Sequence, residues 1–280
     1  MSNPSQKNYD TKAPPMVSVL VSVYNGDVKI VHDALQSVVR QTYSDLEILI
    51  IDDGSGLEIK KLLETIESMD KRVVLVRNQS NIGLTKSLNK GIGLAKGKYV
   101  ARMDADDISY NNRISEQVDF LEHNQKIAMV GARFSEIIGG EVVQQRLPFI
   151  ETYDKILESI VRFNPFCHSS TMIRTNVLKE LGGYDEKFKY AQDYDLWLRL
   201  TVNHQAENIN KVLVARRMDD GISVKNEQQQ RLFAIKARIK FINHYGFKIK
   251  YLIPVVCAMI AYLVGIKGQM LFRCIKRGVA

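Results

Sequence analysis

The amino-acid sequence predicts an α/β fold in which a mostly parallel sheet is covered by helices on both faces. Short apolar runs rich in Val and Ile alternate with segments whose apolar residues recur at helical spacing. Strands and helices that alternate in this way form parallel sheets with the connecting helices on either side. Polar clusters also follow three of the predicted strands. With 280 residues, of which 45% are hydrophobic, the chain is long enough to bury a large core.

The expected elements follow one another in a regular order. Apolar runs predict strands at 17–23, 46–51, 73–76 and 98–103, and helical spacing predicts helices at 28–40, 58–68 and 82–95. Another helix is expected from about Asn112, and a strand at 171–173, a helix at 176–181 and an apolar helical segment at 196–200 come later. The pattern between these two groups is weaker, and no internal repeat is visible.

An acidic cluster, formed by Asp104, Asp106 and Asp107, directly follows the predicted strand at 98–103. In α/β proteins, ligands bind at the edge of the sheet where the strands end. Carboxylates this close repel one another unless positive charge lies between them, and a divalent cation that carries a phosphate meets that need. The alternative is a solvated acidic turn that caps the next helix, because Asp is common in turns and caps.

Two further polar clusters follow earlier strands. Ser22, Tyr24 and Asn25 leave the first strand, and Asp52 and Asp53 leave the second. Each cluster taken alone is also typical of a turn. Because the carboxyl ends of parallel strands meet at one edge of a sheet, we expect all three clusters to converge there.

The net charge of +8 comes from the C-terminal part of the chain. No acidic residue follows Glu227, whereas ten Lys or Arg do, so the preceding part carries about −2. An uncharged run at 251–266 lies inside this basic segment. It is shorter than the roughly 20 residues that span a bilayer, and Pro254 should shorten any continuous helix. Basic flanks favour an in-plane or re-entrant anchor on an anionic leaflet, with a core helix as the alternative.

Composition disfavours several classes of protein. The basic segment contains no recognised nucleic-acid-binding module, so we expect no nucleic-acid partner. No apolar stretch precedes Met16, as a secretory signal would require. Cys167, Cys257 and Cys274 form neither a metal-type spacing nor an even set for disulfides, which fits a reducing cytoplasm. We therefore expect a cytoplasmic protein that is peripheral to the inner face of the plasma membrane.

The ordered set of motifs resembles the family 2 glycosyltransferases, which have the GT-A fold. The resemblance covers roughly residues 16–220. Its pieces are Val17-Ser18-Val19 running into Tyr24-Asn25, Gln41-Thr42, Asp52-Asp53-Gly54-Ser55, Asn81-Ile82-Gly83, Lys86-Ser87-Leu88-Asn89, Gly97-Lys98-Tyr99, Asp104-Ala105-Asp106-Asp107, Gly182-Gly183-Tyr184-Asp185 and Gln192-Asp193-Tyr194-Asp195-Leu196-Trp197-Leu198-Arg199.

We expect three parts of the chain. Composition predicts a disordered N-terminus at residues 1–15, and the resemblance implies a GT-A domain at residues 16–222. The charge pattern favours basic, partly hydrophobic helices that associate with a membrane at residues 223–280. The implied function is inverting, metal-dependent transfer of a sugar from a nucleotide-diphosphate donor, a UDP-sugar, in cell-surface polysaccharide biosynthesis. The implied acceptor is a saccharide or a lipid-linked saccharide.

The resemblance also assigns the donor site. Ser22, Tyr24 and Asn25 would lie beside the nucleotide base, and Asp53, with Asp52 next to it, would accept a hydrogen bond from the uracil imide. Asp106 would be the main ligand of Mn²⁺ or Mg²⁺ and Asp104 would support it, with the metal bridging the diphosphate. Lys86 would meet a phosphate, and its alternative is a solvated helix lysine.

Asp193 is the expected general base, which removes the acceptor proton on the face opposite the leaving group. It precedes an apolar helical segment, and a helix N-terminus favours a charged carboxylate. An N-cap without chemistry is the alternative, and Asp195 is the second candidate base. The family often has Glu-Asp here, whereas this chain has Gln192-Asp193. His168, Tyr184 and Asp185 are the expected acceptor contacts, although a histidine satisfied by nearby backbone is common.

Two other functions compete with this hypothesis. A non-catalytic scaffold that binds sugar nucleotides would keep the fold without turnover, although both Asp106 and Asp193 are present. A sugar-nucleotide pyrophosphorylase has a related sheet, but such enzymes usually open with a glycine-rich phosphate loop. Residues 17–27 contain a single glycine, Gly26.

Overall fold

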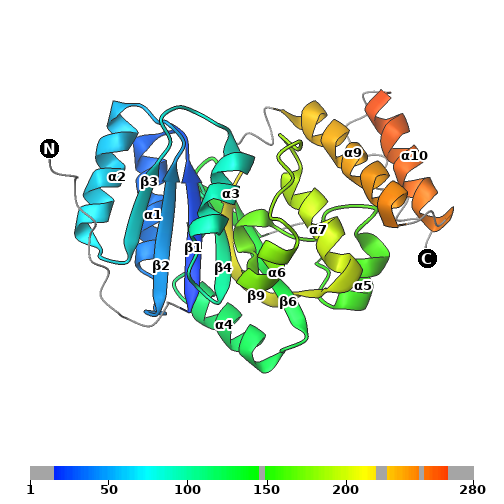
Figure 1. Ribbon diagram of the computed structural model, residues 1–280, viewed down its shortest axis with the longest axis horizontal. Coiled ribbons are helices and arrows are strands. Elements are labelled where there is room, and N and C mark those ends of the chain that lie inside the picture. Colours follow the sequence, from blue (N-terminus) through cyan, green and yellow to red (C-terminus); the bar gives the residue numbers. More distant parts are fainter. Residues whose placement is uncertain (1–15, 145–148, 219–225, 246–248, 264–280) are drawn as a thin grey trace, which may run out of the picture.

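A computed structural model describes residues 16–144, 149–218, 226–245 and 249–263 (Figure 1). The N-terminal segment predicted to be disordered, 1–15, lies outside the described residues. So does the predicted domain boundary at 222–223. The predicted strands and helices of the first half are confirmed to within two residues at each end.

The described strands form one nine-stranded sheet with the order β3-β2-β1-β4-β8-β6-β9-β5, and β7 pairs with β6. Their bounds are β1 Val17–Val23, β2 Leu46–Asp52, β3 Val73–Arg77, β4 Tyr99–Asp104, β5 Ile108–Ser109, β6 Ile127–Ile138, β7 Glu141–Gln144, β8 Met172–Arg174 and β9 Gln205–Arg217. The long strands β6 and β9 fall in the part of the sequence where the pattern is weak.

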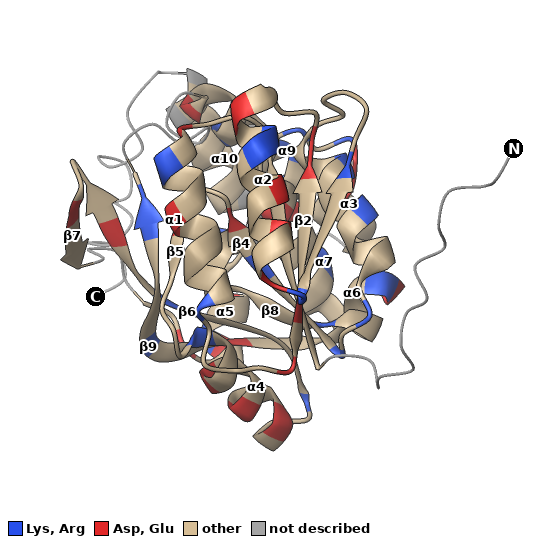
Figure 2. Ribbon diagram, turned by 90° about the vertical axis from the view of Figure 1, so that its left-hand side faces the viewer, with Lys and Arg blue, Asp and Glu red and all other residues tan. Residues whose placement is uncertain are grey.

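The first four strands are parallel, as predicted, and this places their ends together. β1 lies between β2 and β4, with Val23 opposite Asp52 and Ser22 opposite Asp104. β8 then joins β4 in the antiparallel direction, which makes the sheet mixed. Figure 2 shows red acidic segments beyond the tip of β2 at the upper edge of the sheet. The polar clusters that follow β1, β2 and β4 therefore meet at one edge.

Helices cover both faces of the sheet. The elements are α1 Val28–Val39, α2 Leu57–Met69, α3 Leu84–Leu94, α4 Arg113–His123, α5 Tyr153–Ser159, α6 Thr175–Glu180, α7 Gln192–Asn203, α9 Glu227–Tyr245 and α10 Ile249–Leu263, with a short 3₁₀ helix, η1, at His168–Ser170. The buried residues of α1, α2 and α4 join one core cluster, and those of α3, α5, α6 and α7 join a second.

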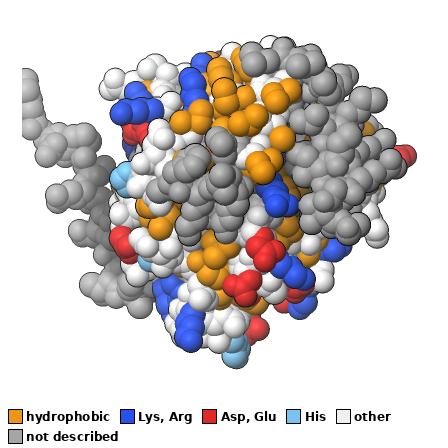
Figure 3. All heavy atoms as spheres, turned by 90° about the vertical axis from the view of Figure 1, so that its right-hand side faces the viewer, with side chains coloured by type: hydrophobic (Ala, Val, Ile, Leu, Met, Phe, Trp, Pro, Cys, Tyr) orange, Lys and Arg blue, Asp and Glu red, His pale blue; other side chains and the backbone are white. Residues whose placement is uncertain are grey.

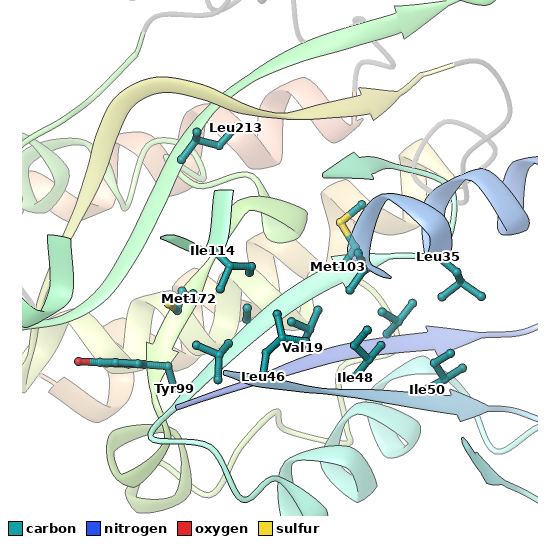
Figure 4. Packing of buried hydrophobic residues seen from close by; sticks show 14 of the residues in the cluster. Val19, Leu35, Leu46, Ile48, Ile50, Tyr99, Met103, Ile114, Met172 and Leu213 are labelled. Atoms are coloured by element: carbon teal, nitrogen blue, oxygen red, sulfur yellow. The ribbon is translucent and has the colours of Figure 1, made fainter. Parts of the chain in front are cut away.

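The alternation of side chains along β1 explains the two cores. Val19 and Val21 point into the cluster that Figure 4 shows, together with Ile48 and Ile50 of β2. Leu20, between them, belongs to the cluster on the other face. Neighbouring residues of a strand point to opposite faces, so an all-apolar strand can fill both cores at once.

The C-terminal helices differ in how they contact the rest of the chain. Ala237 of α9 is buried in the second core, and Phe233 packs against the same cluster, so α9 is part of the globular structure. α10 begins at Ile249 and continues through Pro254, contrary to the expectation that this proline shortens the helix. Pro254 is the sixth helical residue, so its missing N–H removes only one intrahelical bond. In the described part of the chain, no helix is both long and apolar enough to cross a membrane.

Candidate active site

Asp104, the last residue of β4, is held by two neighbours. The buried Arg102 guanidinium, only 2% exposed, forms an ion pair with its carboxylate. The Ser169 hydroxyl of η1 donates to Asp104 Oδ2 at 2.7 Å, and the Asp104 amide donates to Ser169 Oγ at 3.1 Å. Burial alone would raise the pKa of Asp104, but the charge of Arg102 holds that pKa below its usual range. Asp104 is therefore an anion at neutral pH.

Among the described residues, neither of the two following carboxyls forms an ion pair like that of Asp104 with Arg102. Burial, and then the charge of Asp104, raises the pKa of Asp106 to about 6. Burial, together with both neighbouring carboxylates, raises the pKa of Asp107 to about 7. The Arg217 amide at the end of β9 donates to Asp107 Oδ1 at 2.7 Å. The cluster thus places three carboxyls close together, and their burial and mutual repulsion disfavour the ionised forms of Asp106 and Asp107.

This donor set fits a divalent cation that is shared with a ligand. Among the described residues, no three His, Cys, Asp or Glu side chains are arranged to hold a metal ion by themselves. Mg²⁺ and similar hard cations usually take one or two carboxylates and complete their shell with phosphate oxygens and water. Asp104 and Asp106 offer such carboxylates. Burial and mutual repulsion raise the pKa values of Asp106 and Asp107, and a bound cation would supply the positive charge that stabilises their ionised forms.

Asp193 lies in the first turn of α7, close to this cluster. Asn164 Nδ2 donates to Asp193 Oδ2 at 2.9 Å. Burial raises the pKa of Asp193, and the charge of Asp104 raises it further. Arg216 of β9 is half-buried and interacts electrostatically with Asp104, Asp107 and Asp193. The acidic cluster and the predicted base therefore share one neighbourhood.

Asp195, the second candidate base, is a structural residue. Its side chain is buried, with 2% exposed. Arg199 Nε donates to one carboxylate oxygen at 2.9 Å, and Lys240 Nζ of α9 donates to the other at 2.7 Å. Both oxygens are engaged with cations, which leaves Asp193 as the better candidate.

At the end of β1, hydrogen bonds join two loops and leave an aromatic ring on the surface. The Asn25 amide donates to Ser55 Oγ at 3.0 Å, and the Gly56 amide donates to Asn25 Oδ1 at 2.8 Å. Asn25 has a left-handed backbone with a φ of 52°, which Asn tolerates better than most residues. Tyr24, next to it, is 54% exposed. An exposed aromatic ring at this edge of the sheet is able to stack on a nucleotide base.

Asp53 organises the loop that follows β3. Its buried carboxylate accepts hydrogen bonds from Asn78 Nδ2 at 2.8 Å and from the amides of Ile82 and Gly83 at 2.9 Å each. A carboxylate has about four lone-pair sites, so one remains for a further donor such as an imide N–H. The neighbouring Asp52 accepts from the Ser55 amide at 2.9 Å. Both predicted roles stay predictions, but each residue also has a structural task.

The other two predicted donor contacts lie at the same edge. Ser22 is half-buried and pairs with Asp104 in the register of β1 and β4. Lys86 is exposed in the first turn of α3, the helix that follows β3. Their contacts with a ligand stay predictions.

The predicted acceptor contacts separate into two groups. His168 Nε2 and the Tyr184 hydroxyl are 2.8 Å apart, and the two rings pack edge to face. Burial, and then the charge of Arg102, lowers the pKa of His168 to about 3, so the imidazole is neutral. Asp185, in contrast, is bonded to Lys240 of α9 at 2.7 Å. His168 and Tyr184 therefore lie beside the acidic cluster, whereas Asp185 ties α9 to its neighbouring loop.

Five residues that shape the site were not predicted from the sequence: Arg102, Asn164, Ser169, Arg216 and Arg217. Arg102 carried a signal, because an arginine inside an apolar strand needs a buried carboxylate partner. Asn164 and Ser169 lie in an irregular segment with no periodicity. The two arginines are the last residues of β9, a strand that was not predicted.

With this geometry in view, comparison with known proteins decides the family. The model of glycosyl transferase family 2 matches residues 18–182. The chain belongs to this family. As a family 2 glycosyltransferase it is a transferase, and the predictions of its family, fold and enzyme class are confirmed.

Curated relatives of this glycosyltransferase cover most of its length. An uncharacterized glycosyltransferase of Haemophilus influenzae is 32% identical over 86% of this chain and 78% of its own. The amylovoran biosynthesis glycosyltransferase AmsE of Erwinia amylovora is 29% identical over 80% and 87%. The O-antigen biosynthesis glycosyltransferase WbnJ of Escherichia coli is 30% identical over 75% and 83%.

Solved structures confirm the GT-A fold of this glycosyltransferase. S. aureus TarS 1–349 in complex with UDP-GlcNAc has a TM-score of 0.66 at 18% identity, over 81% of this chain and 66% of that one. The mannosyltransferase PcManGT of Pyrobaculum calidifontis, solved with GDP-Man and Mn²⁺, has a TM-score of 0.66 at 17% identity, over 92% and 73%. At these identities the likeness concerns the fold alone.

Proposed function

We propose that this glycosyltransferase transfers a sugar, with inversion, from a nucleoside diphosphate donor to a saccharide hydroxyl, and that the reaction requires a divalent metal. The observation that carries the proposal is the electrostatic coupling of Asp193 with Asp104 and Arg216 across one site. A base, an acidic cluster for a cation and a guanidinium for a phosphate are the groups that this chemistry needs.

The acidic cluster would hold the donor. Asp106 and Asp104 would ligate Mn²⁺ or Mg²⁺, which when bound neutralises the charge that develops on the departing diphosphate. Arg216 would contact the same phosphates, since guanidinium groups match phosphate oxygens well. Tyr24 would stack on the base, and Asp53 would accept from its imide through the remaining lone pair, which favours a UDP-sugar.

Asp193 would take the proton of the acceptor hydroxyl as that oxygen attacks the anomeric carbon. Burial raises the pKa of Asp193 toward neutrality, which improves a carboxylate as a base. Asn164 donates to one carboxylate oxygen and fixes its direction, while the other oxygen can receive the proton. One base and one in-line displacement give inversion at the anomeric carbon.

The names of two relatives support a proposal for the acceptor class. AmsE and WbnJ are named for amylovoran and O-antigen biosynthesis. By analogy, we propose that this glycosyltransferase extends a saccharide or lipid-linked saccharide in the assembly of a cell-surface polysaccharide. His168 and Tyr184, which lie beside the acidic cluster, are the proposed acceptor contacts.

We also propose that the C-terminal helices bind the cytoplasmic face of a membrane. α10 exposes Ile253, Val256, Met259 and Ile260, at spacings that form one stripe, and Ile253 is 68% exposed. Figure 3 shows hydrophobic side chains gathered in the upper half of the face that carries α9 and α10. No acidic residue follows Glu227 in the sequence, and an apolar stripe within basic sequence suits an anionic leaflet.

A donor screen tests the catalytic proposal. The purified chain with Mn²⁺ is incubated with a panel of UDP- and GDP-sugars, and the released nucleoside diphosphate is measured. We expect release from one or more UDP-sugars, and Asp193→Asn should abolish it without weakening UDP binding. Equal turnover by Asp193→Asn would refute the role of the base, and pyrophosphate as the product would indicate a pyrophosphorylase.

Fractionation tests the membrane proposal. The full chain should sediment with vesicles that contain anionic lipid and remain soluble with neutral vesicles. Replacement of Ile253 and Ile260 by Ser should abolish sedimentation, whereas Val142→Ser, at an exposed apolar position on β7, should not. Unchanged sedimentation of the α10 variant would refute the anchor.

A further inference from the structure

The helix that carries Asp193 begins from a strained residue. Ala191, directly before α7, has a left-handed backbone with a φ of 50°. In the described part of the chain, Asn25 is the only other non-glycine residue with a positive φ. For a residue with a Cβ, this conformation is about five- to thirtyfold less populated than the right-handed one. It persists only where the surroundings hold it.

The contacts that hold Ala191 come from α9. The Ala191 amide donates to Gln230 Oε1 at 3.1 Å. The ring of the preceding Tyr190 packs edge-on against Phe233, with ring centroids 5.6 Å apart. On the other side, the Ala191 carbonyl accepts from the Asp195 amide at 3.1 Å, within the first turn of α7. The left-handed residue is thus fixed between α9 and α7.

α9 also contacts α7 beyond Ala191. Lys240 Nζ donates to the Asp195 carboxylate at 2.7 Å. The Arg238 guanidinium lies 4.9 Å from the centroid of the Tyr194 ring. Figure 1 shows α9 beside α7. Residues on both sides of Asp193 are therefore held by a helix that lies beyond residue 182, where the family match ends.

We propose that α9 positions the general base, and that Gln230 is the positioning residue that keeps Ala191 left-handed. Relaxation of Ala191 to a right-handed backbone would turn the start of α7 and move Asp193 away from Asn164 and the acidic cluster. Gln230 does not touch the reacting atoms, and the donor is held elsewhere, on β1, β2 and β4. Its loss should therefore lower kcat and leave the donor KM unchanged. This inference rests on the proposed role of Asp193.

Rescue by glycine gives a direct test. Gln230→Ala, Ala191→Gly and the double variant are made in the full chain and assayed with Mn²⁺ and the UDP-sugar that the unsubstituted chain turns over fastest. Glycine adopts a positive φ without steric cost, so it needs no external hold. We expect Gln230→Ala to lower kcat about tenfold at unchanged KM, and the double variant to recover to within about twofold of Ala191→Gly. Gln229→Ala, an exposed neighbour on α9, is the matched control.

Distinct results would overturn the inference. These are an unchanged kcat in Gln230→Ala, an equal loss in the double variant, or an effect confined to donor KM. If Gln230→Ala fails to fold, Gln230→Met, which fills a similar volume without an acceptor oxygen, replaces it. If the unsubstituted chain turns over no nucleotide sugar, the proposed function fails instead. Melting temperatures then still test whether Gln230 stabilises the left-handed backbone of Ala191. Ala191→Gly should raise the melting temperature of the Gln230→Ala chain more than that of the unsubstituted chain.

Discussion

Removal of the Asn164 hydrogen bond should shift the pH dependence of catalysis by a predictable amount. Asn164 Nδ2 stabilises the charged form of Asp193 across 2.9 Å, so Asn164→Ala should raise the pKa of Asp193 further. A hydrogen bond to a charged group is worth about 1.5–3 kcal/mol, and the exposure of Asn164 reduces this to about 1 kcal/mol. At 1.36 kcal/mol per unit, the pKa should rise by about 0.7 unit.

The sign of the effect follows from the role of Asp193. A base acts when deprotonated, so activity falls as the pH falls through its pKa. This fall is the acidic limb of the pH profile, and a higher pKa moves the limb to higher pH. Asn164→Asp keeps the shape of the side chain but places a second carboxylate beside Asp193. At about 3 Å, repulsion between two like charges costs about 1 kcal/mol at the dielectric constant of water and about 5 kcal/mol at that of a protein surface. The pKa of Asp193 should therefore rise by about 1–4 units.

The assay is kcat for nucleoside diphosphate release, measured from pH 5 to 9 with saturating donor. Asn164→Asp should shift the limb more than Asn164→Ala. Each variant should still reach a pH-independent alkaline plateau, which is lower than that of the unsubstituted chain because the bond that fixes the direction of Asp193 is lost. Asn176→Ala, at an exposed position on α6, should leave the profile in place. A kcat that falls by the same factor at every pH would show that Asn164 only shapes the site and would refute this account.

Three further outcomes are expected. Chelation with EDTA should abolish turnover and Mn²⁺ should restore it, whereas Asp106→Asn should lower turnover at least about 100-fold even with excess Mn²⁺, with the exposed Asp119→Asn as a control. Tyr24→Ala should raise donor KM about 5- to 100-fold while Tyr24→Phe keeps it, because stacking on a base is worth about 1–3 kcal/mol. Gly97→Ala places a Cβ 2.5 Å from the Ser18 backbone nitrogen. This substitution should lower the free energy of unfolding, measured by denaturant titration, by about 1–3 kcal/mol, whereas Gly93→Ala, in open space on α3, should not lower it.

The part of the fold that the sequence predicts is the part whose contacts are close in sequence. β1 to β4 and their helices follow one another, and β1, β2 and β4 are mostly apolar and almost fully buried, which fits a sheet covered on both faces. β6, in contrast, is mostly buried but contains polar residues such as Arg133 and Ser135 among its apolar ones, and β9 mixes buried and exposed residues irregularly. The register between the two strands shifts twice between Ala132 and Phe134. No single period marks such strands, so they were missed.

The candidate site divides in the same way. Asp53 and Asp104 were found because each follows a strand, and parallel register brings those ends together. Ser169, which bonds Asp104, is 65 residues away in sequence, and Arg216 is further still. Such partners meet only through the mixed sheet, and local pattern carries no information about it.

This division predicts that the proposed donor contacts and the proposed base respond differently to substitution. The proposed donor contacts at the ends of β1, β2 and β4 are fixed by backbone register, which side-chain substitutions elsewhere barely disturb. Asp193 is fixed instead by side chains, through Asn164 on one side and Gln230 on the other. A change at either contact would move the base and the acceptor side without disturbing the diphosphate site. We therefore expect the contacts around the proposed base to be more sensitive to substitution than the proposed donor contacts, and the determinants of acceptor specificity should be sought in the segments around η1 and α9.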